Sequence, residues 1–383
     1  MNGCEEQAMR MDREGKRMKA YEHVNGQASA TEGSGTIADS AAVTESRKAE
    51  HIEICLNRDV GGERIRTGFE RYRFRHNALP ERRLADISLS TVFLNKTLRA
   101  PLLVSSMTGG TKEAAVINMR LAAAAERRGW AMGLGSMRAA IEKEELADTF
   151  RIRKVASTIP VIANLGAVQL NYGYGADQCR HAVELAEADA LVLHLNSLQE
   201  AFQPEGDTDF SGLLNRIEQV CKSLHVPVGI KEVGWGIDGE SARKLAEAGI
   251  SFIDVAGAGG TSWSQVEKHR SRDAVRKAAA EAFADWGIPT AECIRDVRTA
   301  VPDAVVIGSG GVQSGVDAAK AIALGADLAG FGRSLLAAAV DSEELIEALF
   351  GKLELELRIA MFGIGAGTIR ELKETNRLEM SGL

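Results

Sequence analysis

The chain has 383 residues, of which 45% are apolar, so it can bury one large core or two ordinary ones. A net charge of −7 and a pI of about 5.7 argue against nucleic acid as a partner, and no apolar run approaches the roughly 20 residues of a membrane span. The five cysteines are scattered without a CxxC pair and the N-terminus has no secretory signal, so we expect a cytoplasmic protein without a membrane partner.

The first 45 residues are polar and weakly patterned, and we expect them to form a disordered extension ahead of one domain at 46–383. Ser46 is suited to cap a helix. Arg47 and His51 would then share one face of that helix, with Lys48 beside them. Two interpretations stay open for this basic face, namely a solvated start of a helix and a clamp for an anion.

Residues 64–94 precede the periodic part of the chain. Arginine and aromatic residues are concentrated at 64–80, and 86–94 alternates polar and apolar residues as a strand does. We interpret this part as a hairpin that plugs the bottom of a barrel. Nucleic-acid binding by the arginines is the competing interpretation, but no basic motif surrounds them and the protein is acidic.

Short apolar runs that end in small or polar residues alternate, from residue 101 onward, with Ala-rich amphipathic stretches. The runs are 102–107, 131–136, 161–166, 191–196, 228–231, 252–257, 305–309 and 328–332. Eight such units predict an α/β protein with a TIM (β/α)8 barrel. A doubly wound open sheet is the alternative, which is less favoured because few open sheets carry eight units in register.

The longest gap between two of these runs separates the sixth from the seventh. It contains Trp263, a charged stretch at 267–277 and the segment 285–290. The active site of a barrel is built from the loops at the C-terminal ends of its strands, so a long insertion there lies over the catalytic face. We therefore predict a lid after strand six.

Glycine-rich turns follow the seventh and eighth runs, at 309–313 and 330–333, and each precedes a helix. In this fold, backbone N–H groups at these two turns commonly bind a phosphate, and Arg333 would add a positive charge. The alternative is that the glycines serve only tight turns. The presence of two such turns together favours a phosphate site.

Lys231 ends the apolar fifth run and would point into the barrel, where an ammonium must find an anion or lose its charge. It suits either a Schiff-base nucleophile or the edge of a flavin that gains negative charge on reduction. Neutral hydrogen-bonding groups at other strand ends favour a flat heterocycle, namely Thr108, Ser136, Asn164 and Thr261. Glu232 is expected on the opposite side of the strand, at the surface or against a helix.

The end of the fourth run carries a group of polar residues, His194, Asn196, Gln199 and Glu200. A single carboxylate is too few for a caged metal, but it suits Mg2+, which keeps waters and takes phosphate oxygens from its substrate. Arg138, together with Arg47 and Lys48, would neutralise the remaining phosphate charge. His194 has an alternative role as a satisfied core histidine.

These stretches, taken together, resemble the type 2 isopentenyl-diphosphate delta-isomerases, which are FMN-dependent TIM-barrel enzymes. The resemblance runs from about residue 46 to the end of the chain and does not cover the first 45 residues. The matching motifs are RKAEH (47–51), HNALPE (76–81), MTGG (107–110), GSMR (135–138), HLNSLQE (194–200), KEVG (231–234), GGTSW (259–263), WGIPT (286–290) and SGG (309–311).

The resemblance implies the conversion of isopentenyl diphosphate to dimethylallyl diphosphate, with reduced FMN, NADPH as the electron source and Mg2+. It implies that FMN is held by Met107, Thr108, Gly109, Ser136, Asn164, Lys231, Thr261, Gly311, Val312, Gln313, Gly332 and Arg333. It implies that the substrate is bound by Arg47, Lys48, Ser136, Met137, Arg138 and Gln199, and Mg2+ by Glu200. Gln199 and His194 are the candidate catalytic side chains, and the family mechanism shuttles the proton through N5 of the flavin. Homotetramers or homo-octamers are implied too, with 47–51 reaching a neighbouring site.

Two rival functions stay open. An FMN-dependent 2-hydroxy-acid oxidase has the same fold and cofactor, but it needs a histidine base and an arginine clamp at the end of strand six. That place reads GGTSW here, with His269 and Arg270 further on. The second rival is a phosphate-ligand-binding barrel without catalysis.

Overall fold

Eight short parallel strands close into a barrel in chain order, as the sequence predicts. Pairing between the last strand and the first closes the ring, with Ala329 opposite Leu102. The strands are β4 (Leu102–Val104), β5 (Ala131–Gly133), β6 (Val161–Gly166), β7 (Ala190–His194), β8 (Val228–Lys231), β9 (Phe252–Asp254), β10 (Val305–Gly308) and β11 (Leu328–Phe331). Each of them falls within or overlaps one of the eight apolar runs, and the open-sheet alternative is wrong.

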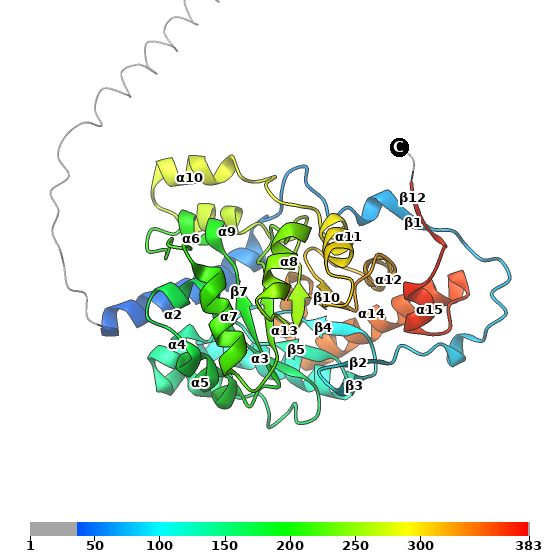
Figure 1. Ribbon diagram of the computed structural model, residues 1–383, viewed down its shortest axis with the longest axis horizontal. Coiled ribbons are helices and arrows are strands. Elements are labelled where there is room, and N and C mark those ends of the chain that lie inside the picture. Colours follow the sequence, from blue (N-terminus) through cyan, green and yellow to red (C-terminus); the bar gives the residue numbers. More distant parts are fainter. Residues whose placement is uncertain (1–36, 382–383) are drawn as a thin grey trace, which may run out of the picture. The chain divides into compact units, whose positions relative to one another are not determined.

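This computed structural model describes residues 37–381, with side-chain surroundings from Arg47 onward (Figure 1). Residues Ala41–Leu383 form one compact unit. Helix α2 (Ile37–Asn57) begins before Ser46, so the expected cap at Ser46 is wrong. Helix α2 includes residues 37–45 of the extension predicted to be disordered at 1–45, and the rest of that extension lies outside the described residues.

Helices connect the strands and cover the outside of the barrel. Helix α3 (Lys112–Arg128) shows why these segments are helical, because Thr111 caps its first turn through Ala114 N and Gly129 ends it in a left-handed conformation. The others are α4 (Arg138–Glu142), α5 (Ala176–Ala186), α6 (Ser197–Phe202), α7 (Leu213–Ser223), α8 (Gly239–Glu247), α11 (Thr290–Ala300), α12 (Gly315–Ala323), α13 (Arg333–Asp341), α14 (Glu343–Ile364) and α15 (Ile369–Lys373). Their buried faces and the strands share one large apolar core.

A hairpin before the barrel closes its lower end. It consists of β2 (Thr91–Phe93) and β3 (Lys96–Leu98), and both turn residues between them have positive φ, as a two-residue hairpin turn requires. Phe93 and Leu98 form a separate core cluster with residues from the first halves of the barrel strands. A hairpin therefore plugs the barrel as predicted, but its second strand lies beyond the predicted end at residue 94.

The arginine-rich segment at 64–80 is not part of that hairpin, which corrects the sequence interpretation. Its strand β1 (Tyr72–Phe74) pairs antiparallel with β12 (Leu378–Met380) near the end of the chain (Figure 1). Two of its arginines bind carboxylates, Arg71 with Glu292 at 2.6 Å and Arg75 with Glu379 at 3.6 Å. These two side chains therefore belong to surface ion pairs.

The insertion after strand six folds into two helices, α9 (Trp263–Arg270) and α10 (Ala274–Glu281). Helix α9 packs against α6, which follows the fourth barrel strand. The insertion thus lies at the end of the barrel where the chemistry is expected, while its movement as a lid stays a prediction. Within 37–381, no helix combines the length and the apolar character needed to cross a membrane.

Candidate functional site

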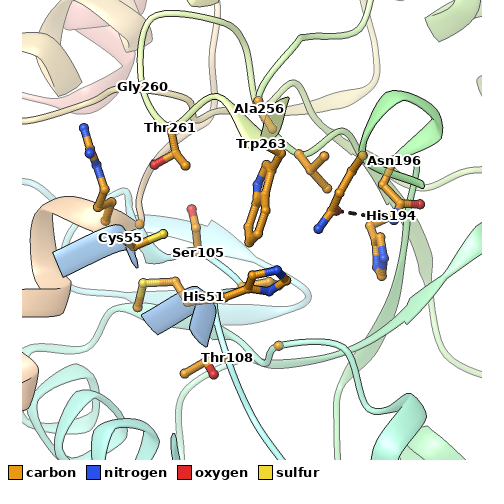
Figure 2. Close-up of a pocket in the computed structure, with 18 of the residues that line it drawn as sticks. His51, Cys55, Ser105, Thr108, His194, Asn196, Ala256, Gly260, Thr261 and Trp263 are labelled. Carbon is orange, nitrogen blue, oxygen red and sulfur yellow. Dashed lines mark hydrogen bonds between the residues drawn. The ribbon is translucent and has the colours of Figure 1, made fainter. Parts of the chain in front are cut away.

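A cavity of about 520 Å³ opens at the C-terminal ends of the barrel strands (Figure 2). Residues at or just beyond all eight strand ends line it, and helices α2, α6 and α9 complete its walls. Figure 2 shows His51 and Cys55, both on α2, reaching the same space as Trp263. The ring centroids of His51 and Trp263 are 5.0 Å apart in an edge-to-face contact.

Most of the residues singled out from the sequence line this cavity. They are Arg47, Lys48, Met107, Thr108, Ser136, Arg138, Asn164, His194, Gln199, Glu200, Lys231, Thr261, Gly311, Val312, Gln313, Gly332 and Arg333. Two others lie behind the wall. Gly109 packs on Phe150, whose ring a Cβ would approach to 2.1 Å, and Met137 is fully buried. Of residues 47–51, Arg47, Lys48 and His51 line the cavity of their own chain.

The ammonium of Lys231 is buried, and burial lowers its pKa while Asp254 and Glu232 act in the opposite direction. Its Nζ donates a hydrogen bond to the Glu232 carbonyl oxygen. The Glu232 side chain is buried as well, which corrects the expected surface position. Its Oε2 accepts from four successive backbone N–H groups, from Val233 to Gly236, including that of Trp235 at 2.6 Å. This carboxylate therefore shapes the turn after β8.

Asp254, which the sequence analysis missed, ends the neighbouring strand β9. It lies opposite Lys231 in the strand register and accepts a hydrogen bond from Ser309 Oγ at 2.5 Å. The charge of Asp254 raises the pKa of Lys231 and so opposes the larger effect of burial, which lowers it. Asp254 is therefore a nearby carboxylate that favours the charged form of Lys231.

His194 is held as a neutral imidazole. Its Nδ1 lies 2.7 Å from Asn164 Oδ1, an acceptor, so Nδ1 carries the proton and Nε2 is free to accept. Burial, followed by the charges of Lys231 and Lys48, lowers the pKa of His194 to about 3. His194 therefore lines the cavity while its Nδ1 is satisfied by Asn164, and burial favours its neutral form.

Glu200 sits at the start of α6 with both carboxylate oxygens engaged. Oε1 accepts from Asn196 Nδ2 at 2.7 Å, and Oε2 accepts from the backbone N–H of Asp207 at 2.8 Å. Burial raises its pKa, and the two hydrogen bonds act in the opposite direction. Within 37–381, no group of three His, Cys, Asp or Glu side chains could hold a metal. The donor set fits Mg2+ that takes its other ligands from water and phosphate.

Three cations face the same part of the cavity. Lys48 Nζ donates to the Ser136 carbonyl oxygen at 3.0 Å, and burial lowers its pKa to about 7. Arg47 donates to Gln203 at 2.9 Å. Arg138 donates to two carboxylates, described below. These positions favour the anion clamp over a solvated helix start.

Glu267 on α9 is the main site residue that the sequence analysis missed. It is 2% exposed, and its Oε1 lies 3.0 Å from His51 Nε2 and accepts from Gln203 at 3.2 Å. A weaker contact of 3.5 Å reaches Gln199 Nε2. Burial alone would raise its pKa, but His51 and Arg270 outweigh burial and lower it. Glu267 is the first residue of the charged stretch at 267–277 in the insertion. This position was the sequence signal from which it could have been found.

The two glycine-rich turns differ in what they offer a phosphate. At α12, Ser314 and Asp317 form a capping box, and the Asp317 carboxylate accepts from the N–H groups of Gln313 and Ser314. At α13 no side chain caps the first turn. A Cβ at Gly332 would meet only Ser105, at 4.0 Å, so backbone there is open to the cavity. The eighth turn is the better phosphate site.

FMN fits the residues present. Ser105 Oγ is buried in the cavity wall and has no partner among the described residues, so it can bond a ligand. The buried Lys231 suits the edge of the flavin, and the neutral polar residues at the strand ends suit its heterocycle. The open turn at Gly332 suits a phosphate.

Comparisons with known proteins settle the family. The chain is 56% identical to an isopentenyl-diphosphate delta-isomerase from Oceanobacillus iheyensis, over 88% of this chain and 96% of the relative. A relative of the same name from a Nostoc species is 52% identical over 90% and 98%. The chain belongs to the isopentenyl-diphosphate delta-isomerase family. A model of the FMN-dependent dehydrogenases also matches residues 175–378, in agreement with the type 2, FMN-dependent branch of this family.

The fold is also found in mandelate oxidase. One such structure, with bound (S)-2-phenylpropionate, has a TM-score of 0.62 at 21% identity, over 91% of this chain and 99% of that one. At this identity the likeness concerns the fold alone. The residues that the oxidase alternative would need also lie elsewhere, since His269 is exposed and Arg270 is paired with Glu267 at 2.9 Å. Membership of an isomerase family therefore decides against both rival functions.

Proposed function

We propose that this enzyme converts isopentenyl diphosphate to dimethylallyl diphosphate, using reduced FMN, NADPH as the electron source and Mg2+. The observation that carries the proposal is the content of one cavity. Its wall holds a buried ammonium with neutral polar groups, and it also holds three cations with a fixed carboxylate. The first set suits a flavin, and the second set suits a magnesium-bound diphosphate.

The residues that would hold FMN belong to the strand ends. Lys231 would face the N1 and C2 carbonyl edge, while Ser136, Asn164, Thr261 and the main chain at 107–109 would surround the ring. The turns at 311–313 and 332–333 would hold the phosphate. Reduced FMN supplies a proton-transferring group at N5 when it is bound. Proton transfer by the flavin is consistent with a site in which His194 is neutral.

The diphosphate would be bound by Arg47, Lys48 and Arg138 with Ser136 beside them, and Met137 would support this turn through its N–H, which donates to the Asn164 carbonyl oxygen at 2.8 Å. Glu200 would complete the coordination of Mg2+. Gln199 would orient the alkene through its amide, which already contacts Glu267. His194 would accept a hydrogen bond through Nε2, because its Nδ1 is committed to Asn164.

We also propose that the enzyme works in the cytoplasm as a homotetramer or homo-octamer. The bacterial relatives of similar length support the location. The four described cysteines are free thiols, as a reducing compartment requires.

An absorption spectrum of the purified protein, followed by an anaerobic assay, tests the proposal. We expect a flavin spectrum and formation of dimethylallyl diphosphate only when isopentenyl diphosphate, Mg2+ and NADPH are all present. Oxygen consumption with lactate or glycolate serves as the control for oxidase activity. A colourless protein that does not bind FMN, or rapid oxidation of a hydroxy acid without isomerisation, would contradict the proposal.

A further inference from the structure

The loop that follows α6 is fixed against the Glu200 carboxylate. The backbone N–H of Asp207 donates to Oε2, while Asn196 holds Oε1 from the other side. Gly206 packs so closely that a Cβ there would lie 1.9 Å from the Glu200 carbonyl oxygen. Loop and carboxylate therefore have one fixed relative position.

The side chain of Asp207 reaches the other half of the site. Its Oδ2 accepts from Arg138 NH1 at 2.7 Å and from Gln169 Nε2 at 3.2 Å. Arg138 also donates through Nε to Glu142 at 2.7 Å. Because the guanidinium has five N–H donors in a rigid fork, two carboxylates fix its orientation and leave other donors for a ligand. Asp207 thus contacts both the magnesium carboxylate and the diphosphate arginine.

An unsatisfied acceptor beside Glu200 points to a ligand at this place. Asn196 is 3% exposed and lines the cavity, and its Oδ1 has no hydrogen-bond partner among residues 47–381 (Figure 2). A buried amide oxygen without a partner is costly. A donor such as a water bound to a cation would satisfy it. Asn196 and Glu200 therefore mark one side of a hydrated-cation site.

The charges near Arg138 disfavour a metal-free anion. Glu142 and Asp207 place two carboxylates on the Arg138 guanidinium, so a metal-free diphosphate is repelled there more strongly than its less negatively charged magnesium complex. We propose that Asp207 is a positioning residue, and this inference rests on the proposed function. It links Glu200 to Arg138, so that the site selects the Mg2+ complex of a diphosphate over the metal-free diphosphate.

Inorganic pyrophosphate is the probe for this selection, with calorimetric titration of the FMN-loaded protein in the presence and absence of Mg2+. The quantity measured is a ratio, namely the dissociation constant without Mg2+ divided by the dissociation constant with Mg2+. Asp207→Asn keeps the backbone N–H to Glu200 and removes the charge beside Arg138. We expect the ratio to fall by about tenfold, the scale of one partly buried charge, with FMN still bound.

Asp209→Asn is the matched control, because Asp209 is an exposed carboxylate in the same loop and binds Ser211. Its ratio should equal that of the wild type. An unchanged ratio in Asp207→Asn, or an equal fall in both variants, would overturn the inference. If Asp207→Asn loses FMN, Glu142→Gln removes the other carboxylate from Arg138 and must lower the ratio instead.

The assay of the wild-type enzyme separates this inference from the proposed function. If the wild type isomerises isopentenyl diphosphate while Asp207→Asn keeps the pyrophosphate ratio, only the selection by Asp207 fails. If the wild type shows no isomerisation, the proposed function fails, whatever the ratio.

Discussion

Glu200 has the two properties that a magnesium ligand in this cavity needs. Its carboxylate is held by Asn196 and Asp207, so little free energy is needed to fix its position when a cation binds. It is also a carboxylate, the type of ligand that Mg2+ prefers, and it is not among the residues proposed to hold FMN. Loss of its charge should therefore affect the metal and leave the flavin in place.

We predict that Glu200→Gln raises the Mg2+ concentration for half-maximal activity by at least about 100-fold, with FMN affinity unchanged. The measurements are a Mg2+ titration of activity and a flavin fluorescence titration of the same protein. Parallel loss of Mg2+ dependence and FMN affinity would contradict the assignment of Glu200 to the metal.

Lys48 gives the site a dependence on pH that can be worked out from its environment. Burial lowers the pKa of its ammonium to about 7, so the group is charged below pH 7 and neutral above it. The charged form is the one that binds a diphosphate. Binding should therefore weaken as the pH rises through about 7.

We predict that kcat/KM for isopentenyl diphosphate falls by about tenfold or more from about pH 6 to pH 9, since a hydrogen bond to a charged group contributes roughly 1.5–3 kcal/mol. In Lys48→Arg the guanidinium stays charged, so this fall should disappear. The two pH profiles are compared under identical conditions. The same inflection in both proteins would show that another group titrates.

At the scale of elements, the β2–β3 hairpin stabilises the barrel from the end opposite to the site. Phe93 is 3% exposed and contacts the Phe252 ring edge-to-face, with centroids 5.6 Å apart. Val92, on the same strand, points outward and is 67% exposed. Substitutions at Phe93 and Val92 can therefore distinguish filling of the barrel from simple strand formation.

Phe93→Ala should lower the free energy of unfolding by about 3–5 kcal/mol, because it leaves a cavity beneath the barrel. Val92→Ala should change it by less than about 0.5 kcal/mol. Chemical denaturation of both variants measures the difference. Equal effects would mean that the hairpin does not fill the barrel.

At the scale of the whole molecule, the cavity exists only because the barrel closes. Its lining comes from segments as distant in sequence as Arg47 and Arg333. A ligand that contacts this wall therefore binds the folded chain and not the unfolded one. Its binding should stabilise the whole barrel.

We predict that FMN at about 100 times its Kd stabilises the FMN-free protein by about 2.7 kcal/mol, seen as a rise of a few degrees in Tm. Riboflavin, which lacks the phosphate, should give a clearly smaller rise if the turn at Gly332 binds phosphate. Thermal unfolding followed by circular dichroism provides the measurement. Equal rises with both ligands would contradict the phosphate site.

The sequence by itself determined the barrel and much of its upper rim. Eight apolar runs at recurrent spacing are a local signal, and parallel strands joined by helices place their C-terminal ends on one face. The polar residues that follow each run, such as Asn164, His194 and Lys231, therefore had to meet. Alternation at 86–94 indicated one strand of the hairpin plug but not its partner, β3, which lies after that segment.

Only the tertiary structure decided which groups pair with one another. Glu267 meets His51 across more than 200 positions of chain, Asp207 reaches back to Arg138, and β12 returns to β1. Glu232 turned out buried because its carboxylate caps a turn. These contacts depend on the paths of loops and insertions, which leave no periodic pattern in the sequence, because nothing local constrains where a loop residue ends up in space.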